Sequence, residues 1–114
     1  MNTNELTGAA LDWAAATCNG DAPYLYRINT YEPPIYVIKC KNNILTPAYH
    51  YDWSQGGPII EREGITLRCG LHGWDAELPE FDVLMNGASA LEAAMRCFVA
   101  SKLGDTVDIP KELQ

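Results

Sequence analysis

The chain has 114 residues, 47% of them hydrophobic and 20% charged, and this balance predicts a single globular domain spanning residues 1–114. Its formal net charge of -7 argues against a nucleic-acid polymer or a membrane surface as partner, because both recruit clustered Lys and Arg. No apolar run approaches the length of a membrane span, and the polar segment Met1–Glu5 does not resemble a secretory signal, so we expect a cytosolic protein.

The first predicted element is a helix from Glu5 to Cys18, with Asn4 or Thr7 as its cap and Gly20 after its end. Apolar residues recur at helical spacing around Trp13, which we expect to be the large anchor of this helix. Most of its other residues are small, which predicts close packing against a neighbour.

Strands follow the first helix. Tyr24–Ile28 alternates, and Ile35–Cys40 is rich in β-branched and aromatic residues, so both predict strands, with a short third one at Ile44–Thr46. Alternation at Ile65–Leu71 and Trp74–Leu78 predicts two more. The middle of the chain is therefore expected to be an antiparallel meander.

A second helix is predicted from Ala90 to Leu103, after a loop over Pro79–Gly87. Ser89 and Glu92 form a capping-box pattern, and Gly104 stops the helix. Few charges lie within it, so we expect it to pack between the sheet and the first helix or between two subunits. The predicted fold class is α+β, an antiparallel β-meander with two helices packed on one side, and a homodimer or higher homo-oligomer is expected.

The stretch Tyr49–Glu61 is the candidate site, because aromatic, carboxylate, hydroxyl and amide groups crowd there beside two glycines. Backbone N–H groups of the glycines can line an anion-binding concavity, aromatic rings can stack on a base, and polar side chains can contact its edges. Arg96 can hold a phosphate or carboxylate. The predicted ligand-binding residues are Tyr51, Asp52, Trp53, Ser54, Gln55, Gly56, Gly57 and Arg96.

Each of these features also has a structural interpretation. Asp52 can cap a turn, Trp53 can fill the core, and Gly56–Pro58 can shape the entry to a strand that runs to Glu61. Arg96 follows Glu92 by four residues, which suits a surface ion pair. These alternatives remain open at the level of sequence.

Metal and catalytic sites have weaker support. The cysteines never form a Cys-x-x-Cys pair, and we expect free thiols that are mostly buried. Cys69 and His72 provide only two candidate zinc ligands, and alternation places Cys69 on the apolar face. We therefore predict no metal, no cofactor and no catalytic residue. The cysteines are Cys18, Cys40, Cys69 and Cys97.

Three blocks carry a family resemblance: Glu5–Ala14 (ELTGAALDWA), Asp52–Glu61 (DWSQGGPIIE) and Ala93–Asp105 (AAMRCFVASKLGD). Together with the run Val107–Leu113 (VDIPKEL), they resemble the NinX-like family of small proteins from tailed phages and prophages. The resemblance implies a phage accessory protein in the bacterial cytosol, and it implies no activity.

The chain departs from this family pattern at Tyr49–Tyr51 and at Met85–Ser89, next to the candidate site, so its ligand preference is expected to differ. Our leading hypothesis is non-enzymatic binding of a small anionic or nucleotide-like ligand, which would sequester a host defence signal. The alternative is an acidic protein-interaction module that inhibits a host protein. A third hypothesis, a small nucleotide hydrolase, would rest on Asp52, Glu61 or His72 and has no motif behind it.

Overall fold

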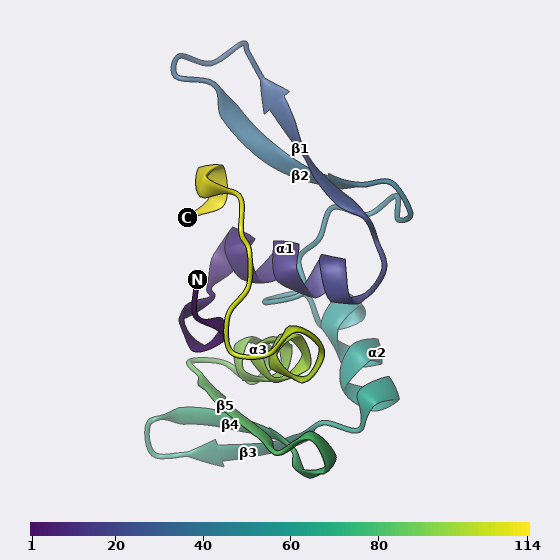
Figure 1. Cartoon of the computed structure of the whole chain (residues 1–114), viewed down its shortest axis with the longest axis vertical. Helices are drawn as coiled ribbons and strands as arrows, with labels where there is room; N and C mark the ends of the chain where they lie inside the picture. Colours follow the sequence, from purple (N-terminus) through teal and green to yellow (C-terminus); the bar gives the residue numbers. More distant parts are fainter.

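The computed structural model describes residues 1–114 and contains three α-helices, five β-strands and three short 3-10 turns (Figure 1). The helices are α1 (Gly8–Cys18), α2 (Trp53–Glu63) and α3 (Ala90–Leu103). The strands are β1 (Pro23–Ile28), β2 (Ile35–Cys40), β3 (Thr66–Gly70), β4 (Gly73–Leu78) and β5 (Val83–Gly87). The 3-10 turns cover Thr3–Glu5, Pro79–Phe81 and Lys111–Leu113. This element content confirms the predicted α+β class.

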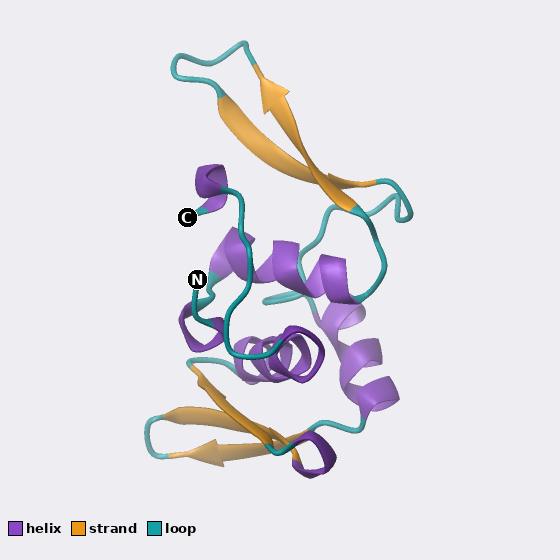
Figure 2. Ribbon diagram, in the orientation of Figure 1, coloured by secondary structure: helices purple, strands orange, loops and turns teal.

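The strands form two separate antiparallel sheets, a β1–β2 hairpin and a β3–β4–β5 meander. Helix α3 lies directly on the meander, α1 packs on the opposite side of α3, and α2 packs beside it (Figure 2). Three helices are present where two were predicted, and one of them covers the sheet alone. The expectation that α3 packs between the sheet and the first helix is confirmed.

Helix α3 begins and ends where its sequence signals predict. Ser89 Oγ accepts a hydrogen bond from the Glu92 N–H at 3.1 Å, and Gly104 ends the helix at a positive φ of 85°. Phe98 and Met95 are fully buried within it. Burial of a side chain of this size stabilises a fold by about 1.5–3 kcal/mol, so α3 is the centre of the hydrophobic core.

Helix α1 starts later than predicted, because Thr3–Glu5 forms a separate 3-10 turn and Thr7 occupies the N-cap position. Its small residues do allow a close approach, but the neighbour is α3 of the same chain. Ala14 of α1 and Ala94 of α3 are both buried. The small faces of the two helices are therefore used inside the chain, and the predicted homo-oligomer would need another surface.

The structure corrects the prediction after Asp52. In place of a rigid loop and a strand from Pro58 to Glu61, the chain forms helix α2. Asp52 is its N-cap, and Gly64, at a φ of 71°, is the left-handed residue that ends it. The segment Arg62–Gly64, whose glycine suits a hairpin turn by sequence alone, is therefore the C-terminal end of a helix.

Two residues in α2 that usually disfavour a helix are tolerated for identifiable reasons. A Cβ on Gly56 would lie 2.6 Å from Leu91 Cδ2 and 2.9 Å from the Tyr49 carbonyl oxygen, so the absence of a side chain lets the helix approach the core. Pro58 cannot donate to the carbonyl of Ser54, but Ser54 is exposed, so water can replace that bond. Tertiary packing thus overrides the local preference for a loop.

The predicted loop at Pro79–Gly87 contains a strand, β5, which pairs antiparallel with β4. Asp82 adopts a left-handed φ of 54° and reverses the chain between them. Met85 packs against the core while Leu84 is exposed, so the strand is half-buried. Because the exposed Leu84 is apolar, hydrophobic and polar residues do not alternate at the start of this strand, and the sequence lacks the usual signal of a half-buried strand.

The β1–β2 hairpin stands off from the rest of the molecule (Figure 1). Both strands lie where they were predicted, but Ile38 is the only buried residue in the segment 23–40. We call residues 23–40 the arm and the rest of the chain the body. The predicted third strand at Ile44–Thr46 does not form, since only an isolated bridge joins Cys40 to Asn43.

All four cysteines are free, and Cys69 is exposed, which makes the core prediction for this residue wrong. It lies near the end of the edge strand β3, where α3 gives little cover. Burial raises the pKa of the Cys18 and Cys97 thiols to about 11. No helix of the chain is long and apolar enough to cross a membrane.

Candidate functional site

The predicted site residues begin at the N-terminus of α2, where Asp52 and Ser54 bond to each other. Asp52 Oδ1 accepts hydrogen bonds from the Ser54 N–H at 2.9 Å and from Ser54 Oγ at 2.6 Å. This is the N-cap geometry that satisfies the first free donors of a helix. Asp52 therefore has a structural role, as one of the two interpretations anticipated, although it caps a helix instead of a turn.

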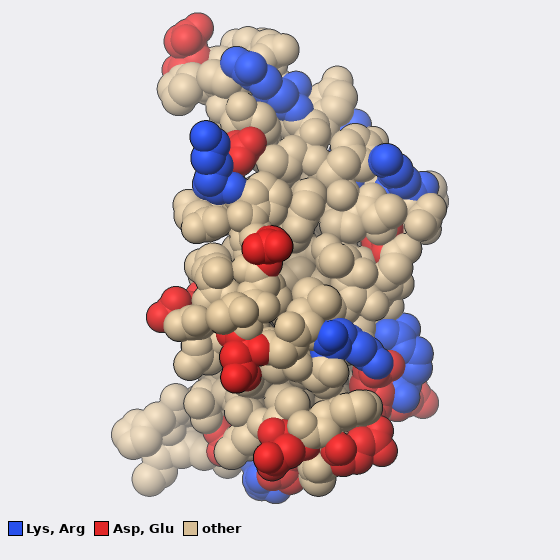
Figure 3. Space-filling view, viewed as in Figure 1, with Lys and Arg blue, Asp and Glu red and all other residues tan.

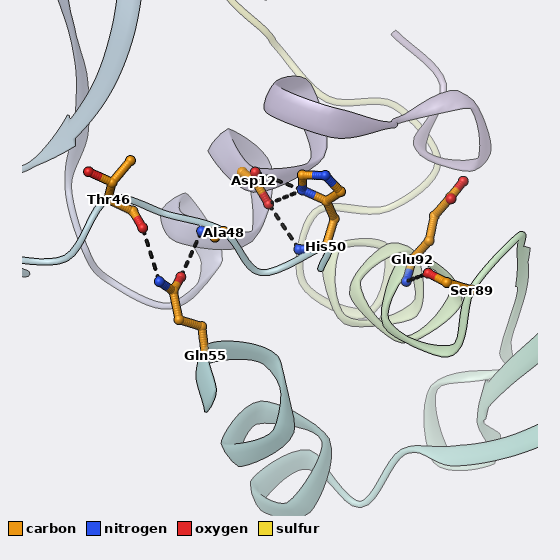
Figure 4. Close-up of polar contacts among 7 residues, drawn as sticks. All are labelled: Asp12, Thr46, Ala48, His50, Gln55, Ser89 and Glu92. Carbon is orange, nitrogen blue, oxygen red and sulfur yellow. Dashed lines mark hydrogen bonds and ion pairs between the residues drawn. The ribbon is translucent and has the colours of Figure 1, made fainter. Parts of the chain in front are cut away.

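Gln55 and Gly56 are occupied within the chain. Gln55 Oε1 accepts from the Ala48 N–H at 2.7 Å, and its Nε2 donates to the Thr46 carbonyl at 3.0 Å, so its amide holds the preceding loop against α2 (Figure 4). The Gly56 N–H donates to the Asp52 carbonyl at 2.9 Å. The expected anion-binding concavity of glycine N–H groups is therefore absent, because both glycines lie inside a helix.

Arg96 lies away from α2 and joins three parts of the body. Its Nε donates to the Leu6 carbonyl and its Nη1 to the Asn86 carbonyl, both at 2.8 Å, and Nη2 pairs with Glu92. The ion pair with Glu92, the structural alternative, is confirmed, although the arginine side chain is only 11% exposed. All three guanidinium nitrogens have partners within the chain.

The two aromatic residues of the predicted site are exposed. Tyr51 is 68% and Trp53 55% exposed, so the alternative that Trp53 fills the core is wrong. A Cβ on Gly57 would lie 3.9 Å from Trp53 Cε3, which places the indole ring along the bare helix surface at Gly57. Large rings left in solvent at a helix start are available to a ligand or a partner.

A buried carboxylate beside these rings was not anticipated. His50 Nδ1 lies 2.8 Å from both carboxylate oxygens of Asp12, and the His50 backbone N–H donates to Asp12 Oδ1 at 3.0 Å (Figure 4). Asp12 is buried in α1, and burial raises its pKa while the hydrogen bonds from His50 oppose that rise. The only sequence signal was an acidic residue amid the alanines of α1.

The other imidazole nitrogen of His50, Nε2, has no hydrogen-bond partner in the chain. Every buried polar side-chain atom of the chain does have a partner, so Nε2 is not buried and is open to solvent. The His50 and Tyr51 rings meet edge to face with centroids 4.6 Å apart. We call His50, Tyr51 and Trp53 the aromatic edge. It includes one polar ring nitrogen that a buried carboxylate holds in place and two exposed aromatic rings: Tyr51 in contact with His50, and Trp53 three residues after His50 in the chain.

A second hydrogen-bond network, which sequence reasoning missed, joins the segment after α1 to α2. Tyr49 Oη donates a short hydrogen bond to Asp21, and Asn19 Nδ2 donates to Asp21 Oδ1 at 3.1 Å and to Tyr49 Oη at 3.2 Å. Arg62 Nη1 donates to Asn19 Oδ1 at 3.0 Å. Burial, followed by the neighbouring Asp21 carboxylate, raises the pKa of the Tyr49 phenol.

This network borders a shallow groove of about 180 Å³. Of the predicted site residues, only Ser54 and Gln55 line it, while Tyr51, Trp53, the two glycines and Arg96 do not. The predicted constellation is therefore divided between a groove, an exposed edge and a structural arginine. The groove is lined by Asn19, Asn43, Leu45, Tyr49, Ser54, Gln55, Pro58, Ile59 and Arg62.

The chain brings together no group of three or more His, Cys, Asp or Glu side chains in a geometry that could hold a metal ion. The carboxylates and histidine of the hydrolase hypothesis lie on different elements. Asp52 and Glu61 are at opposite ends of α2, and His72 is in the β3–β4 turn. The Asp12–His50 pair has no hydroxyl or thiol nucleophile within hydrogen-bond distance.

These features define a small α+β protein whose candidate recognition site is an exposed surface beside a carboxylate-held histidine. A family model described as "Bacteriophage P22, NinX" matches residues 2–102, so the chain belongs to this phage family. A search of curated proteins finds no match. The match spans all three resemblance blocks, Glu5–Ala14, Asp52–Glu61 and most of Ala93–Asp105.

Proposed function

We propose that this phage accessory protein binds a small nucleotide-like ligand at the aromatic edge and does not convert it chemically. The observation that carries the proposal is the exposure of Tyr51 and Trp53 next to His50, whose outer nitrogen is unpaired. Stacking of a base on an aromatic side chain contributes about 1–3 kcal/mol and tolerates any base, because every base has a π-face.

The histidine would add polar recognition to this stacking. Asp12 accepts from the His50 Nδ1–H, so neutral His50 presents Nε2 as an acceptor, suited to an imide or amino group. Protonated His50 presents Nε2 as a charged donor, suited to a phosphate. Because Asp12 is buried and receives two hydrogen bonds from His50, the imidazole is oriented before the ligand arrives.

Sequestration of a host signalling nucleotide in the bacterial cytoplasm is the role that this chemistry supports for a protein of this phage family. A sequestering protein needs a site that orients a ligand and no group that attacks it. The lack of a nucleophile near His50 fits that requirement.

The test is native mass spectrometry of the purified protein with a panel of cyclic and ADP-ribose-type nucleotides. We expect an adduct with at least one of them, and we expect Tyr51→Ala and Trp53→Ala to weaken its binding at least tenfold. Phe81→Ala, which removes an exposed aromatic ring elsewhere on the body, is the matched control. The proposal would be rejected if no nucleotide formed an adduct, or if both site variants bound the nucleotide with the affinity of the unmodified protein.

A second candidate function is inhibition of a basic host protein through the outer face of the meander. Asp75 and Glu77 alternate in β4 with the buried Ala76, so they lie on the face away from α3. Arg68 pairs with Glu77 on this face, Asp82 lines a hollow together with Glu77, and Glu80 follows in the adjoining 3-10 turn. A salt-sensitive host complex lost in an Asp75→Lys, Glu80→Lys variant would support it. A complex that this double charge reversal leaves intact would contradict it. The control is Asp108→Lys, an exposed charge reversal outside the sheet.

A further inference from the structure

The arm has one face that nothing in the chain covers. Its register places three cross-strand pairs on this face: Tyr24 with Lys39, Tyr26 with Val37, and Ile28 with Ile35. The pairs on the other face include Leu25 with Ile38, and Ile38 is buried toward the body. We call the first set the outer face of the arm.

The outer face is apolar where a solvated ribbon would be polar. Tyr24 is 38%, Tyr26 48% and Ile35 44% exposed, and Tyr31 at the tip of the arm is 56% exposed. An isolated two-stranded hairpin is marginally stable in water and needs cover on at least one face. The arm extends from the body while carrying apolar side chains on both faces, which is the pattern of a surface that becomes buried on association.

The exposed surface continues past the arm. A hollow of about 410 Å³ at its base is lined by Tyr24 and Lys39 of the outer face and by the loop 43–46. In that loop Ile44 is fully exposed and Leu45 more than half exposed. The outer face and this hollow share Tyr24 and Lys39, so the two surfaces adjoin.

Charge indicates what covers this surface. The arm holds two basic residues, Arg27 and Lys39, against the single acidic Glu32, a net charge of +1. Since the whole chain has a net charge of -7, the body carries -8. In Figure 3 basic side chains lie over the arm at the top with an acidic group at its tip, while acidic side chains, with basic ones among them, lie over the lower part of the body.

We propose that the arm docks on the acidic body of a second copy of this chain, with the two copies exchanging arms about a two-fold axis. Pairing of one arm with the other would place like charges together, whereas exchange places each basic arm against an acidic body. Reciprocal exchange closes the assembly at two chains. A nucleic-acid polymer fits less well, because Lys39 is the one cation on the outer face and the whole chain is acidic.

The available area suffices for such a dimer. At roughly 200 Å² for each tyrosine ring and its side chain, the exposed parts of Tyr24, Tyr26 and Tyr31 amount to about 300 Å² per arm. Two arms, each covering an equal area of the partner, would bury about 1,200 Å² in total, the lower end for a specific interface. The hollow at the base of the arm adds to this area. The proposal is independent of any ligand at the aromatic edge.

The test is sedimentation equilibrium of the full chain over a range of concentrations at low and high salt. We expect a dimer whose Kd rises with salt and rises at least tenfold in a Tyr26→Ser, Ile35→Ser variant. Leu71→Ser is the matched control, because Leu71 is 98% exposed in the β3–β4 turn and lies outside the arm. Lys39→Glu should weaken the dimer by a similar factor, while Lys111→Glu, an exposed residue of the body, should not.

Several results would overturn the proposal. These are a monomer at every concentration, a dimer indifferent to the arm variants, or a dimer that salt strengthens. A monomer that binds a labelled single-stranded oligonucleotide through Arg27 and Lys39 would assign the arm to nucleic acid instead. Far-UV circular dichroism of each variant separates loss of the interface from loss of the fold.

Discussion

The body and the arm both contain apolar and aromatic side chains, but the body buries them and the arm leaves most of them exposed. In the body, Phe98, Met95 and Leu11 are fully buried between α3, α1 and the meander. In the arm, tyrosine and isoleucine side chains remain in solvent, and Ile38 alone is buried. Apolar content therefore does not indicate burial within one chain, and the arm has the composition of a core without its own cover.

The comparison also separates two kinds of constraint on sequence. The body is constrained by its own packing, since a misplaced Cβ at Gly56 meets a backbone atom. If the arm docks as we propose, its constraint comes from the second copy, because Tyr24, Tyr26 and Ile35 of its outer face remain in solvent within one chain. Substitutions should therefore affect stability in the body and association in the arm.

The largest effect is expected at the centre of the body. Phe98→Ala removes a fully buried ring and should lower the free energy of unfolding by about 3–5 kcal/mol. Urea unfolding followed by circular dichroism measures the change. Phe81→Ala, at a half-exposed ring, should change stability by no more than about 0.5 kcal/mol. Similar losses in both variants would contradict the placement of α3 at the core.

Two adjacent glycines of α2 should respond with opposite signs. Gly56→Ala places a Cβ against Leu91 and the Tyr49 carbonyl and should destabilise the chain by about 1–3 kcal/mol. Gly57→Ala meets nothing closer than Trp53 at 3.9 Å and should stabilise it by about 0.5–1 kcal/mol through helix propensity. Equal signs in urea unfolding would show that α2 is not seated on α3 as described.

Alkaline pH should test the burial of thiols in the body. The pKa of Cys97 is about 11 in the folded chain and 9.0 in its ordinary state, so the folded form keeps a proton that the unfolded form loses. This contribution to stability is complete below pH 9 and is lost as pH rises through about 11. Cys97→Ala should flatten the fall in unfolding free energy over this window, and Cys69→Ala, at an exposed thiol, should not. Parallel curves for wild type and Cys97→Ala would contradict this burial.

The smallest effect is expected in the arm. Tyr26→Ser at concentrations too low for association should change the unfolding free energy by no more than about 0.5 kcal/mol, because the ring is half exposed and Lys39 Nζ lies over it, 4.1 Å from its centroid. Leu84→Ser, an exposed residue of the body, provides the reference. A loss as large as that of Gly56→Ala would show that the arm folds back on its own body.

The parts of the fold that were predicted correctly carry local signals. Helix α3 has Ser89 and Gly104 at its ends, and the arm strands are runs of β-branched and aromatic residues. Helix α2 was missed, although Asp52 and Gly64 mark its ends, because Gly-Gly-Pro is a loop signal unless a neighbouring surface requires close approach. That requirement comes from Leu91, distant in sequence, and no local pattern contains it.

The candidate site was predictable only in part, for a related reason. Aromatic residues at the start of α2 could be selected from sequence, and Tyr51 and Trp53 are indeed exposed. The partner of His50 could not be identified from sequence, because Asp12 is 38 residues away and contacts His50 only once α1 has packed on the body. Arg96 looked available because its acceptors are the backbone carbonyls of Leu6 and Asn86, which a sequence does not display.

The link between Arg96 and Leu6 has a consequence for how the chain is made. The two residues are 90 positions apart, and a ribosome adds about 5–20 residues each second, so roughly 5–18 s pass between their synthesis. During that interval α1 exists without the helix that covers it, and its apolar face is open to chaperones. A product released before α3 has been made would keep that face uncovered, so premature termination should yield fragments that are degraded instead of partly working protein.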